Sequence, residues 1–244
     1  MFGVVAGPLG NARLRTDVTT WGDLFGRAEE YDAPTESIRE SLAERRERRA
    51  RGDDGADRER SIAAEESPTE TDDPDSTTVP DEPDPTTVPD EPDPTRVVAD
   101  ADVLAADLLV GGPARAALDR VREHSWMNLV ASDPLLADAE AVVAGLADAA
   151  LGADWRARAG RERVRVEHPA GDHPGLASAY RGGAAHLFTF DEGLASVRTG
   201  LSVQPYAGLS VRHPDAFATV FDAAGLYRTV AQGDYPGPDR DPRG

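Results

Sequence analysis

Between residues 96 and 231, apolar residues occur in two patterns, short runs typical of strands and a spacing typical of helices. Short runs rich in β-branched or aromatic residues predict strands at 96–99, 128–131, 163–166, 186–190 and 209–211. Apolar residues at helical spacing between these runs predict helices at 102–110, 113–126, 134–150, 174–180, 192–198 and 214–223. Strands that alternate with helices form a parallel sheet that is covered on both faces. We therefore expect a three-layer α/β domain with a central parallel sheet over residues 96–232.

The pattern in residues 1–51 predicts a short helical segment. Thr19 or Thr20 can cap a helix over 21–31, and Thr35 can cap a second helix that runs to about Arg51. So few residues cannot build a firm core alone, and we expect them to dock elsewhere. The second helix ends in a run of arginines, which are Arg45, Arg46, Arg48, Arg49 and Arg51. Cations favour a helix C-terminus and are normally solvated there; the alternative is a basic surface that binds RNA or a protein partner.

Residues 52–95 predict a disordered acidic linker. They consist mostly of Asp, Glu, Pro, Ser and Thr, with 16 acids against 2 arginines. The nonapeptide TTVPDEPDP occurs twice in tandem, at 77–85 and 86–94. Such a segment cannot bury enough apolar surface to offset the ordering of its backbone, and its prolines and carboxylates favour an extended chain. Residues 233–244, rich in Pro, Gly and Asp, predict a disordered tail.

The composition narrows the possible chemistry and suggests the habitat. The formal net charge is −19, all 26 basic residues are arginine, and the chain has no cysteine. Disulfides, thiolate metal sites and cysteine nucleophiles are therefore excluded. An acid-rich, lysine-free composition is typical of cytoplasmic proteins from halophilic organisms, where surface carboxylates keep the protein hydrated. The sequence shows no signal-peptide pattern and no apolar run of about 18 residues, so we expect a cytoplasmic protein without a membrane partner.

Several acids follow the predicted strands. In a parallel sheet, functional side chains gather at the carboxyl ends of the strands. The acids at or near these ends are Asp100, Asp102, Asp138, Glu140, Asp172 and Asp191. Carboxylates brought together at one edge repel each other unless a cation neutralises them, and oxygen ligands suit Mg²⁺ or Mn²⁺. The five histidines show no metal-ligand spacing, and we expect them to be structural or exposed.

The first strand and its acids resemble the opening of the PIN domain family. The segment VVADADVL at 97–104 is similar to a hydrophobic strand followed by Asp-Thr-Asn-Val-Leu, the family's opening pattern. Asp100 stands at the Asp position, Asp102 at the Asn position, and Ala101 replaces the usual hydroxyl residue.

Two later segments extend the resemblance. Ser132 and Asp138 have the family's spacing from a serine to an acid, although that acid is normally Glu. Asp172 and Asp191 fit the closing pattern, in which an Asp starts a helix and a Thr-x-Asp ends the next strand; here Thr189 supplies the threonine.

The resemblance implies a metal-dependent ribonuclease that hydrolyses RNA phosphodiester bonds with Mg²⁺ or Mn²⁺. It implies Asp100 and Asp191 as the main ligands, with Asp138 and Asp172 completing the site. Asp102 would orient a ligand or a water. The remaining candidates are supporting Thr189 and Ser132, and Glu140 as an alternative to Asp138.

Other interpretations stay open. Asp172, Asp191 and Ser132 could simply cap helices. The departures at Ala101 and Asp138 leave room for a PIN-like scaffold that binds RNA or protein without cleaving it.

RNA is the expected partner. The candidates for contact with its backbone are Arg161, Arg163 and Arg165, although a solvated edge is the commoner role of such arginines. A homodimer and a protein partner bound through the N-terminal helices are further possibilities.

Overall fold

The computed structural model describes residues 19–51, 91–197, 208–231 and 233–244. The predicted linker, with most of its tandem repeat, lies outside the described residues as far as residue 90. The last residues of the predicted linker belong instead to the first strand, which begins at Asp93.

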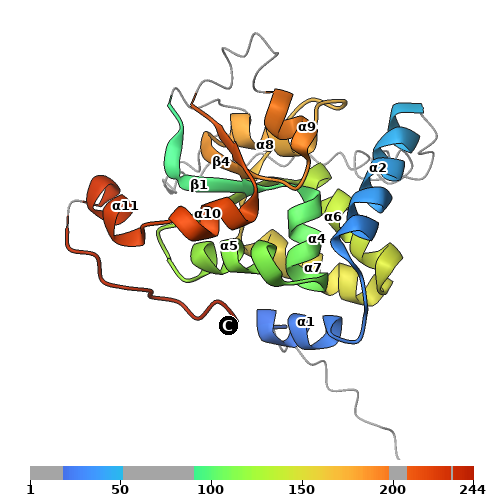
Figure 1. The fold of residues 1–244 in the computed structure, drawn as a ribbon, viewed down its shortest axis with the longest axis horizontal. Helices are drawn as coiled ribbons and strands as arrows, with labels where there is room; N and C mark the ends of the chain where they lie inside the picture. Colours follow the sequence, from blue (N-terminus) through green and yellow to red (C-terminus); the bar gives the residue numbers. More distant parts are fainter. Residues whose placement is uncertain (1–18, 52–90, 198–207, 232) are drawn as a thin grey trace, which may run out of the picture.

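Five parallel strands form the centre of the protein (Figure 1). Their bounds are β1 Asp93–Ala99, β2 Asn128–Ser132, β3 Val164–Val166, β4 Ala184–Phe188 and β5 Ser210–Arg212. The spatial order is β3-β2-β1-β4-β5, and every neighbouring pair is parallel. The prediction of an α/β domain with a central parallel sheet is confirmed.

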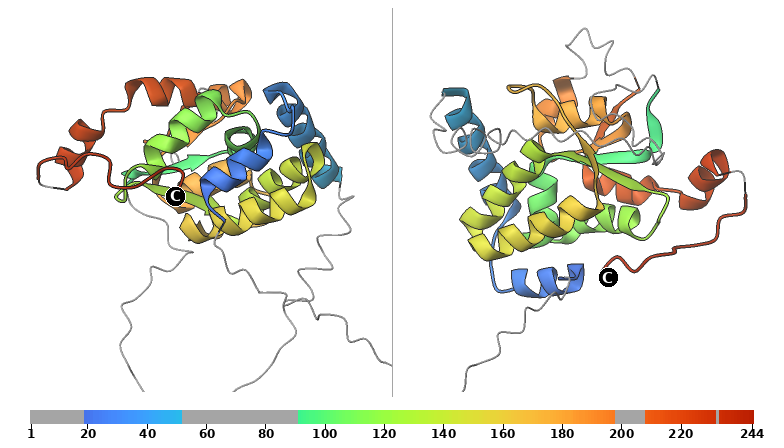
Figure 2. Two further views of the ribbon diagram at one scale, coloured as in Figure 1. Left: turned by 90° about the horizontal axis from the view of Figure 1, so that it is seen from below. Right: turned by 180° about the vertical axis from the view of Figure 1, so that it is seen from behind.

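Helices cover both faces of this sheet (Figures 1 and 2). One face carries α8 (Pro174–Arg181) and α9 (Glu192–Val197). The helices of the other face are α4 (Ala101–Leu109), α5 (Gly112–Arg122), α6 (Asp133–Leu146), α7 (Ala149–Glu162) and α10 (Pro214–Val220). A further helix, α11 (Ala223–Val230), projects from this layer.

The order of the strands fixes where the chain reverses direction across the sheet. From β1 the chain moves outward to β2 and β3, and it then returns to the other side of β1 for β4 and β5. Because crossovers between parallel strands are right-handed, the two halves place their helices on opposite faces. The order reverses between β1 and β4, and the carboxyl ends of strands at such a switch point are the usual place for ligands in α/β proteins.

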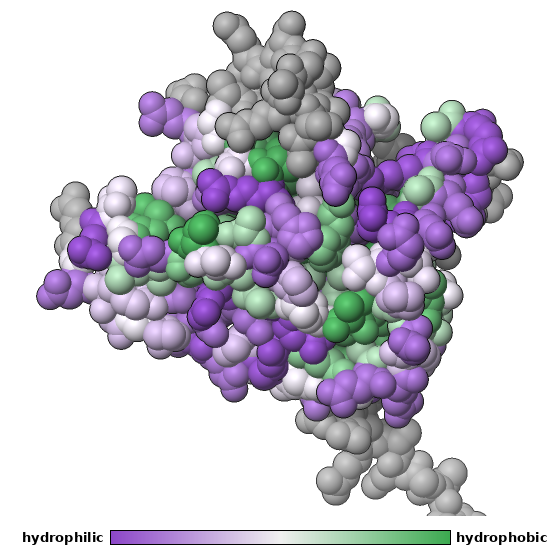
Figure 3. Space-filling view, in the orientation of Figure 1, coloured by the Kyte–Doolittle hydropathy of each residue, from purple (hydrophilic) through white to green (hydrophobic). Residues whose placement is uncertain are grey.

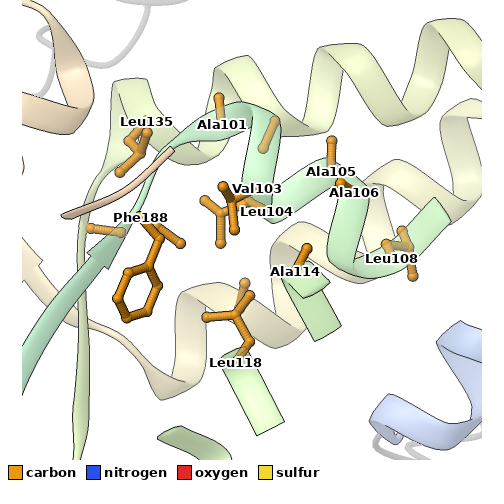
Figure 4. Close-up of a cluster of buried hydrophobic side chains, with 14 of the residues drawn as sticks. Ala101, Val103, Leu104, Ala105, Ala106, Leu108, Ala114, Leu118, Leu135 and Phe188 are labelled. Carbon is orange, nitrogen blue, oxygen red and sulfur yellow. The ribbon is translucent and has the colours of Figure 1, made fainter. Parts of the chain in front are cut away.

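The helix that follows β1 is the most buried element of the protein. Ala and Leu dominate α4, and all 9 of its residues are buried. It is surrounded by β1, α1, α2, α5 and α6. Figure 4 shows its side chains beside Leu118 of α5, Leu135 of α6 and Phe188 of β4. Two of the buried residues on α4 are acids, Asp102 and Asp107.

Several predicted helices end earlier than expected: α1 ends at Ala28 and α5 at Arg122, and two others end early because an aspartate starts another helix. The Asp148 side chain accepts a hydrogen bond from Leu151 N (2.8 Å) and caps α7, so α6 ends at Leu146 instead of about 150. Asp222 caps α11 in the same way, and α10 ends at Val220.

The C-terminal segment, for which the composition predicts disorder, lies along the domain and reaches α1 (Figure 2). Tyr235 Oη lies 2.6 Å from His124 Nε2. Arg243 donates to Asp119 (2.7 Å), and its carbonyl accepts from Gly22 N (2.9 Å). Single polar contacts of this kind leave no mark on composition, which explains the incorrect prediction.

The N-terminal segment forms α1 (Trp21–Ala28) and α2 (Thr35–Arg51), which pack against α4, α6 and α7. The expected docking is therefore observed. Within the described ranges, none of the helices has the length and apolar character needed to cross a membrane.

Candidate functional site

Asp100 and Asp102 lie at the switch point of the sheet. Asp100 directly follows β1 and is fully buried. Its side chain accepts from Ala101 N (2.9 Å) and caps α4, and its own amide donates to Phe188 O of β4 (2.8 Å). The cap is a local role for this carboxylate, but it uses only part of its hydrogen-bonding capacity.

Asp102 links α4 to the end of β4. Its Oδ2 accepts from Phe190 N (3.0 Å) and faces Thr189 Oγ1 at 3.4 Å. Burial and the neighbouring charge of Asp100 raise the pKa of Asp102 to about 7, although these hydrogen bonds oppose the shift. The charge of Asp100 and the burial of Asp102 thus both disfavour the ionised form of Asp102.

Asp191 follows β4 on the same edge. Its Oδ1 accepts from Gly193 N (2.7 Å) and Leu194 N (3.2 Å) at the start of α9, and its amide donates to Thr189 Oγ1 (3.0 Å). Thr189 thus contacts both the side chain of Asp102 and the backbone amide of Asp191. Asp102 and Asp191 both line a cavity of about 470 Å³.

The structure separates Asp138 from Glu140, although both lie on α6. Asp138 is fully buried and accepts hydrogen bonds from α2, whereas Glu140 lies 3.6 Å from Arg156 and lines a different cavity. Residues two apart point to different sides of a helix. Asp138 is therefore the α6 acid on the side of the switch point.

Arginines of α2 neutralise these buried acids. Arg46 Nη2 donates to both carboxylate oxygens of Asp100 (3.1 and 3.0 Å). Arg45 Nε (2.9 Å) and Arg49 Nη2 (2.6 Å) both donate to Asp138 Oδ1. The expectation of a solvated helix end is wrong for these three residues, because buried carboxylates require paired cations.

His173 approaches Asp100 from α8. Its Nδ1 accepts from Leu176 N (3.4 Å), and its buried Nε2 lies 4.0 Å from Asp100 Oδ2 and has no hydrogen-bond partner among the described residues. Burial lowers the pKa of His173, although the charges of Asp100, Asp191 and Asp138 oppose the shift. The lowered pKa favours the neutral form of the ring, whose Nε2 lies near Asp100.

The backbone at the start of α8 lies very close to the side chain of Asp100. A side chain at Gly175 would place its Cβ 2.9 Å from Asp100 Oδ1, so only glycine fits there without displacement. Asp172, predicted to start this helix, is instead exposed in the preceding loop, and His173 caps the helix. Asp172 lines the cavity of about 620 Å³ that also contains Glu140.

The acids described so far lie in a region that matches a protein family model. A family model described as a family of unknown function (DUF7384) matches residues 91–243. The chain belongs to this family. The matched region contains the whole sheet, all the acids described above and the C-terminal segment. No curated protein and no solved structure matches the chain.

The match leaves out α1 and α2. The carboxylates at the switch point thus belong to the DUF7384 domain, whereas the arginines that neutralise them come from a segment outside it.

The remaining predicted residues have local partners. Ser132 caps α6, and its Oγ lies 3.0 Å from both Ser178 Oγ and His168 Nε2. Arg163 and Arg165 pair with Asp133 (2.6 and 3.1 Å), while Arg161 is exposed on α7.

Arg45, Arg46, Arg49 and His173 were not expected as site residues from the sequence. The signal was present for the arginines, because Arg49 lies four residues after Arg45 and three after Arg46, spacings that bring side chains to one side of a helix. Their acidic partners could not be recognised, since Asp100 and Asp138 lie 54 to 93 residues further along the chain.

Proposed function

We propose that the DUF7384 domain binds Mg²⁺ or Mn²⁺ at the switch point and hydrolyses RNA phosphodiester bonds, as the resemblance to PIN nucleases implies. The observation that carries the proposal is the burial of Asp100, Asp102 and Asp138 beside the carboxyl ends of β1 and β4. Buried carboxylates are costly to maintain, and burial without a cationic partner would be strongly unfavourable.

The donor set fits a hard divalent cation in its chemistry, because it consists of carboxylate oxygens. The unpartnered Nε2 of His173 beside Asp100 adds a polar group that is free to contact a water or a substrate. In the structure as it stands, however, no three His, Asp or Glu side chains of the described residues are arranged to hold a metal ion. Cation binding at these acids therefore requires the carboxylates to move together as well as the guanidinium groups to leave.

In this proposal, Asp100, Asp138 and Asp191 hold the cation, and Thr189 keeps Asp191 and Asp102 in position. When bound, a divalent cation there supplies charge stabilisation for the phosphate and activates water. His173 holds a proton on Nε2 that faces Asp100. Asp172 is left out of the ligand set because it is exposed in the loop before α8.

The test uses the full chain carrying Arg45→Gln, Arg46→Gln and Arg49→Gln, so that the acids are uncovered. We expect Mn²⁺-dependent cleavage of a fluorescent single-stranded RNA in molar KCl. Adding Asp138→Asn should lower the rate about 100-fold or more, as expected for loss of a ligand. Glu140→Gln, which removes an acid from the other side of the same helix, is the matched control and should have little effect.

Cleavage that survives both Asp100→Asn and Asp138→Asn would place the chemistry elsewhere. The second candidate function is a non-catalytic scaffold, and the ion pairs of Arg45, Arg46 and Arg49 favour it, because they neutralise the acids without a metal. That function predicts RNA or protein binding without metal-dependent cleavage.

A further inference from the structure

The arginine side of α2 contacts the acids that the proposed function assigns to the metal. Arg46 pairs with Asp100, and Arg45 and Arg49 pair with Asp138. Both carboxylates are fully buried, whereas the three arginine side chains are 20 to 35% exposed. The guanidinium groups therefore occupy the acids from the solvent side, which is the side from which a cation or a phosphate would arrive.

Little else holds α2 in place. Only Ile38 and Leu42 of its 17 residues are buried apolar side chains. The rest of the helix presents a strongly hydrophilic surface (Figure 3). Its position therefore depends to an unusual degree on the ion pairs. Another cation can replace an arginine as the partner of a carboxylate, whereas an apolar contact allows no such exchange.

With α2 docked, the approach to the site is also unsuited to a polyanion. The cavity that reaches Asp102 and Asp191 has α2 as one wall, and the charged side chains of that wall are Glu36, Glu40 and Glu47 together with Arg39 and Arg46. The acids around this cavity outnumber the two arginines, and their net negative charge would repel the phosphates of RNA.

The chain is long enough on both sides for α2 to leave without disturbing the domain. On one side, α1 is fixed by the buried side chains of Trp21, Leu24 and Phe25. On the other side, residues 52–90 separate α2 from β1, and a chain can span up to about 3.3 Å per residue. The anchored α1 would keep α2 at a high local concentration, so that it can dock again.

We propose that α2 is an internal, displaceable inhibitor whose Arg45, Arg46 and Arg49 occupy the carboxylate cluster in place of the divalent cation. Docking of α2 and binding of the cation exclude each other, and the docked helix also keeps RNA away. This inference rests on the proposed function, since it assigns a regulation to the same site.

The first test is calorimetric titration of Mn²⁺ into three full-length chains in molar KCl. The chains are the wild type, the triple variant Arg45→Gln, Arg46→Gln, Arg49→Gln, and a control double variant Arg48→Gln, Arg51→Gln. In the control, Arg51 pairs with Glu47 of α2 itself, and Arg48 is exposed.

If the uncovered state is populated to a tenth or less, removing the inhibitor should tighten Mn²⁺ binding at least about tenfold, and the control should bind like the wild type. Equal, measurable affinity in all three chains would overturn the inhibitor and leave the metal site standing. No binding by any chain would overturn the metal site itself, and the inhibitor with it.

The second test uses the wild type alone, because the triple variant leaves buried acids unpaired and its folding is at risk. Limited digestion with trypsin, mapped by mass spectrometry, reports access to the peptide bonds after Arg45, Arg46 and Arg49. Saturating Mn²⁺ should make these cuts about tenfold faster, while cleavage after Arg27 of α1 stays constant. Unchanged or slower cleavage within α2 would contradict displacement.

Discussion

The central helix α4 has a buried acidic cluster near each end, and the two clusters obtain their counter-charges from different places. Near its C-terminal end, Asp107 pairs with Arg122 and accepts hydrogen bonds at its carbonyl from Arg115, and both arginines lie on the next helix, α5. At its N-terminal end, Asp100 and its neighbour Asp138 pair with arginines of α2. The first cluster is complete within the DUF7384 domain, and the second is not.

The two N-terminal helices reflect the same difference. α1 lays aromatic rings over charges that are already paired, with Arg115 3.7 Å from the ring centroid of Phe25 and Arg122 4.0 Å from that of Trp21. α2, by contrast, supplies the paired charge itself. A buried acid with a partner on a neighbouring helix is part of the scaffold, whereas one whose partner arrives from a separate segment can exchange that partner.

The largest expected effect is a loss of stability at the cluster around Asp107, near the C-terminal end of α4. Arg122→Gln would leave Asp107 buried without its main counter-charge, and we expect a loss of about 3–5 kcal/mol in the free energy of unfolding. Mn²⁺ should not restore this loss, because Asp107 is not part of the proposed metal site. Denaturant unfolding with and without Mn²⁺ measures both quantities.

The matched control for this change is Arg120→Gln, which removes a half-exposed arginine of the same helix that pairs only with nearby Glu123. It should cost less than about 1 kcal/mol. If Arg122→Gln were as mild as its control, or if Mn²⁺ rescued it, the distinction between the two clusters would be lost.

The sequence predicted the sheet because its strands are short runs of apolar residues, with little ambiguity in their spacing. It did not predict α7, since the segment from Leu151 to Glu162 is rich in Ala, Gly and Arg and shows few large apolar residues apart from Trp155. The C-terminal segment was missed for a related reason. Its position depends on individual contacts such as Arg243 with Asp119, and composition does not report them.

The site was predicted only in part. Asp100, Asp102 and Asp191 could be placed together because the carboxyl ends of neighbouring parallel strands meet at one edge. Asp172 was placed with them because it follows the third predicted strand at the expected start of a helix, but the structure leaves it exposed in the loop before α8. The pairing with α2 could not be predicted, since no local pattern relates Arg46 to an acid 54 residues away.

The next effect is the pH dependence of the stability that arises from Asp102, which lies beside Asp100 at the N-terminal end of α4. The pKa of Asp102 in the folded protein is about 7, above its ordinary value of 3.8, chiefly because the carboxyl is buried. Between these two pH values the folded protein holds a proton that the unfolded chain has released, so the contribution of Asp102 to stability falls as pH rises. Asp102→Asn has no such proton to lose.

The variant should therefore gain stability relative to the wild type as pH rises from about 4 to 8, by up to about 4 kcal/mol in total. Urea unfolding across this range, in the presence of a chelator, measures the difference between the two proteins and cancels the other titrating groups. A difference that stays constant with pH would mean that Asp102 keeps an ordinary pKa.

The smallest expected effect is a difference in hydrogen exchange between α2 and α5 as salt increases, and it needs no substitution. Salt screens the self-repulsion of a chain with a net charge of −19, so the melting temperature should rise as KCl increases. The same salt weakens the half-exposed ion pairs that hold α2, and its amides should exchange with solvent about fivefold faster between about 0.2 M and 2 M KCl, equivalent to about 1 kcal/mol. Amides of α5 beside Arg122 should follow the melting temperature instead and exchange more slowly.

Hydrogen exchange resolved by mass spectrometry compares both helices in one sample. Opposite responses support a locally detachable α2, whereas parallel responses would mean that α2 unfolds only with the whole protein.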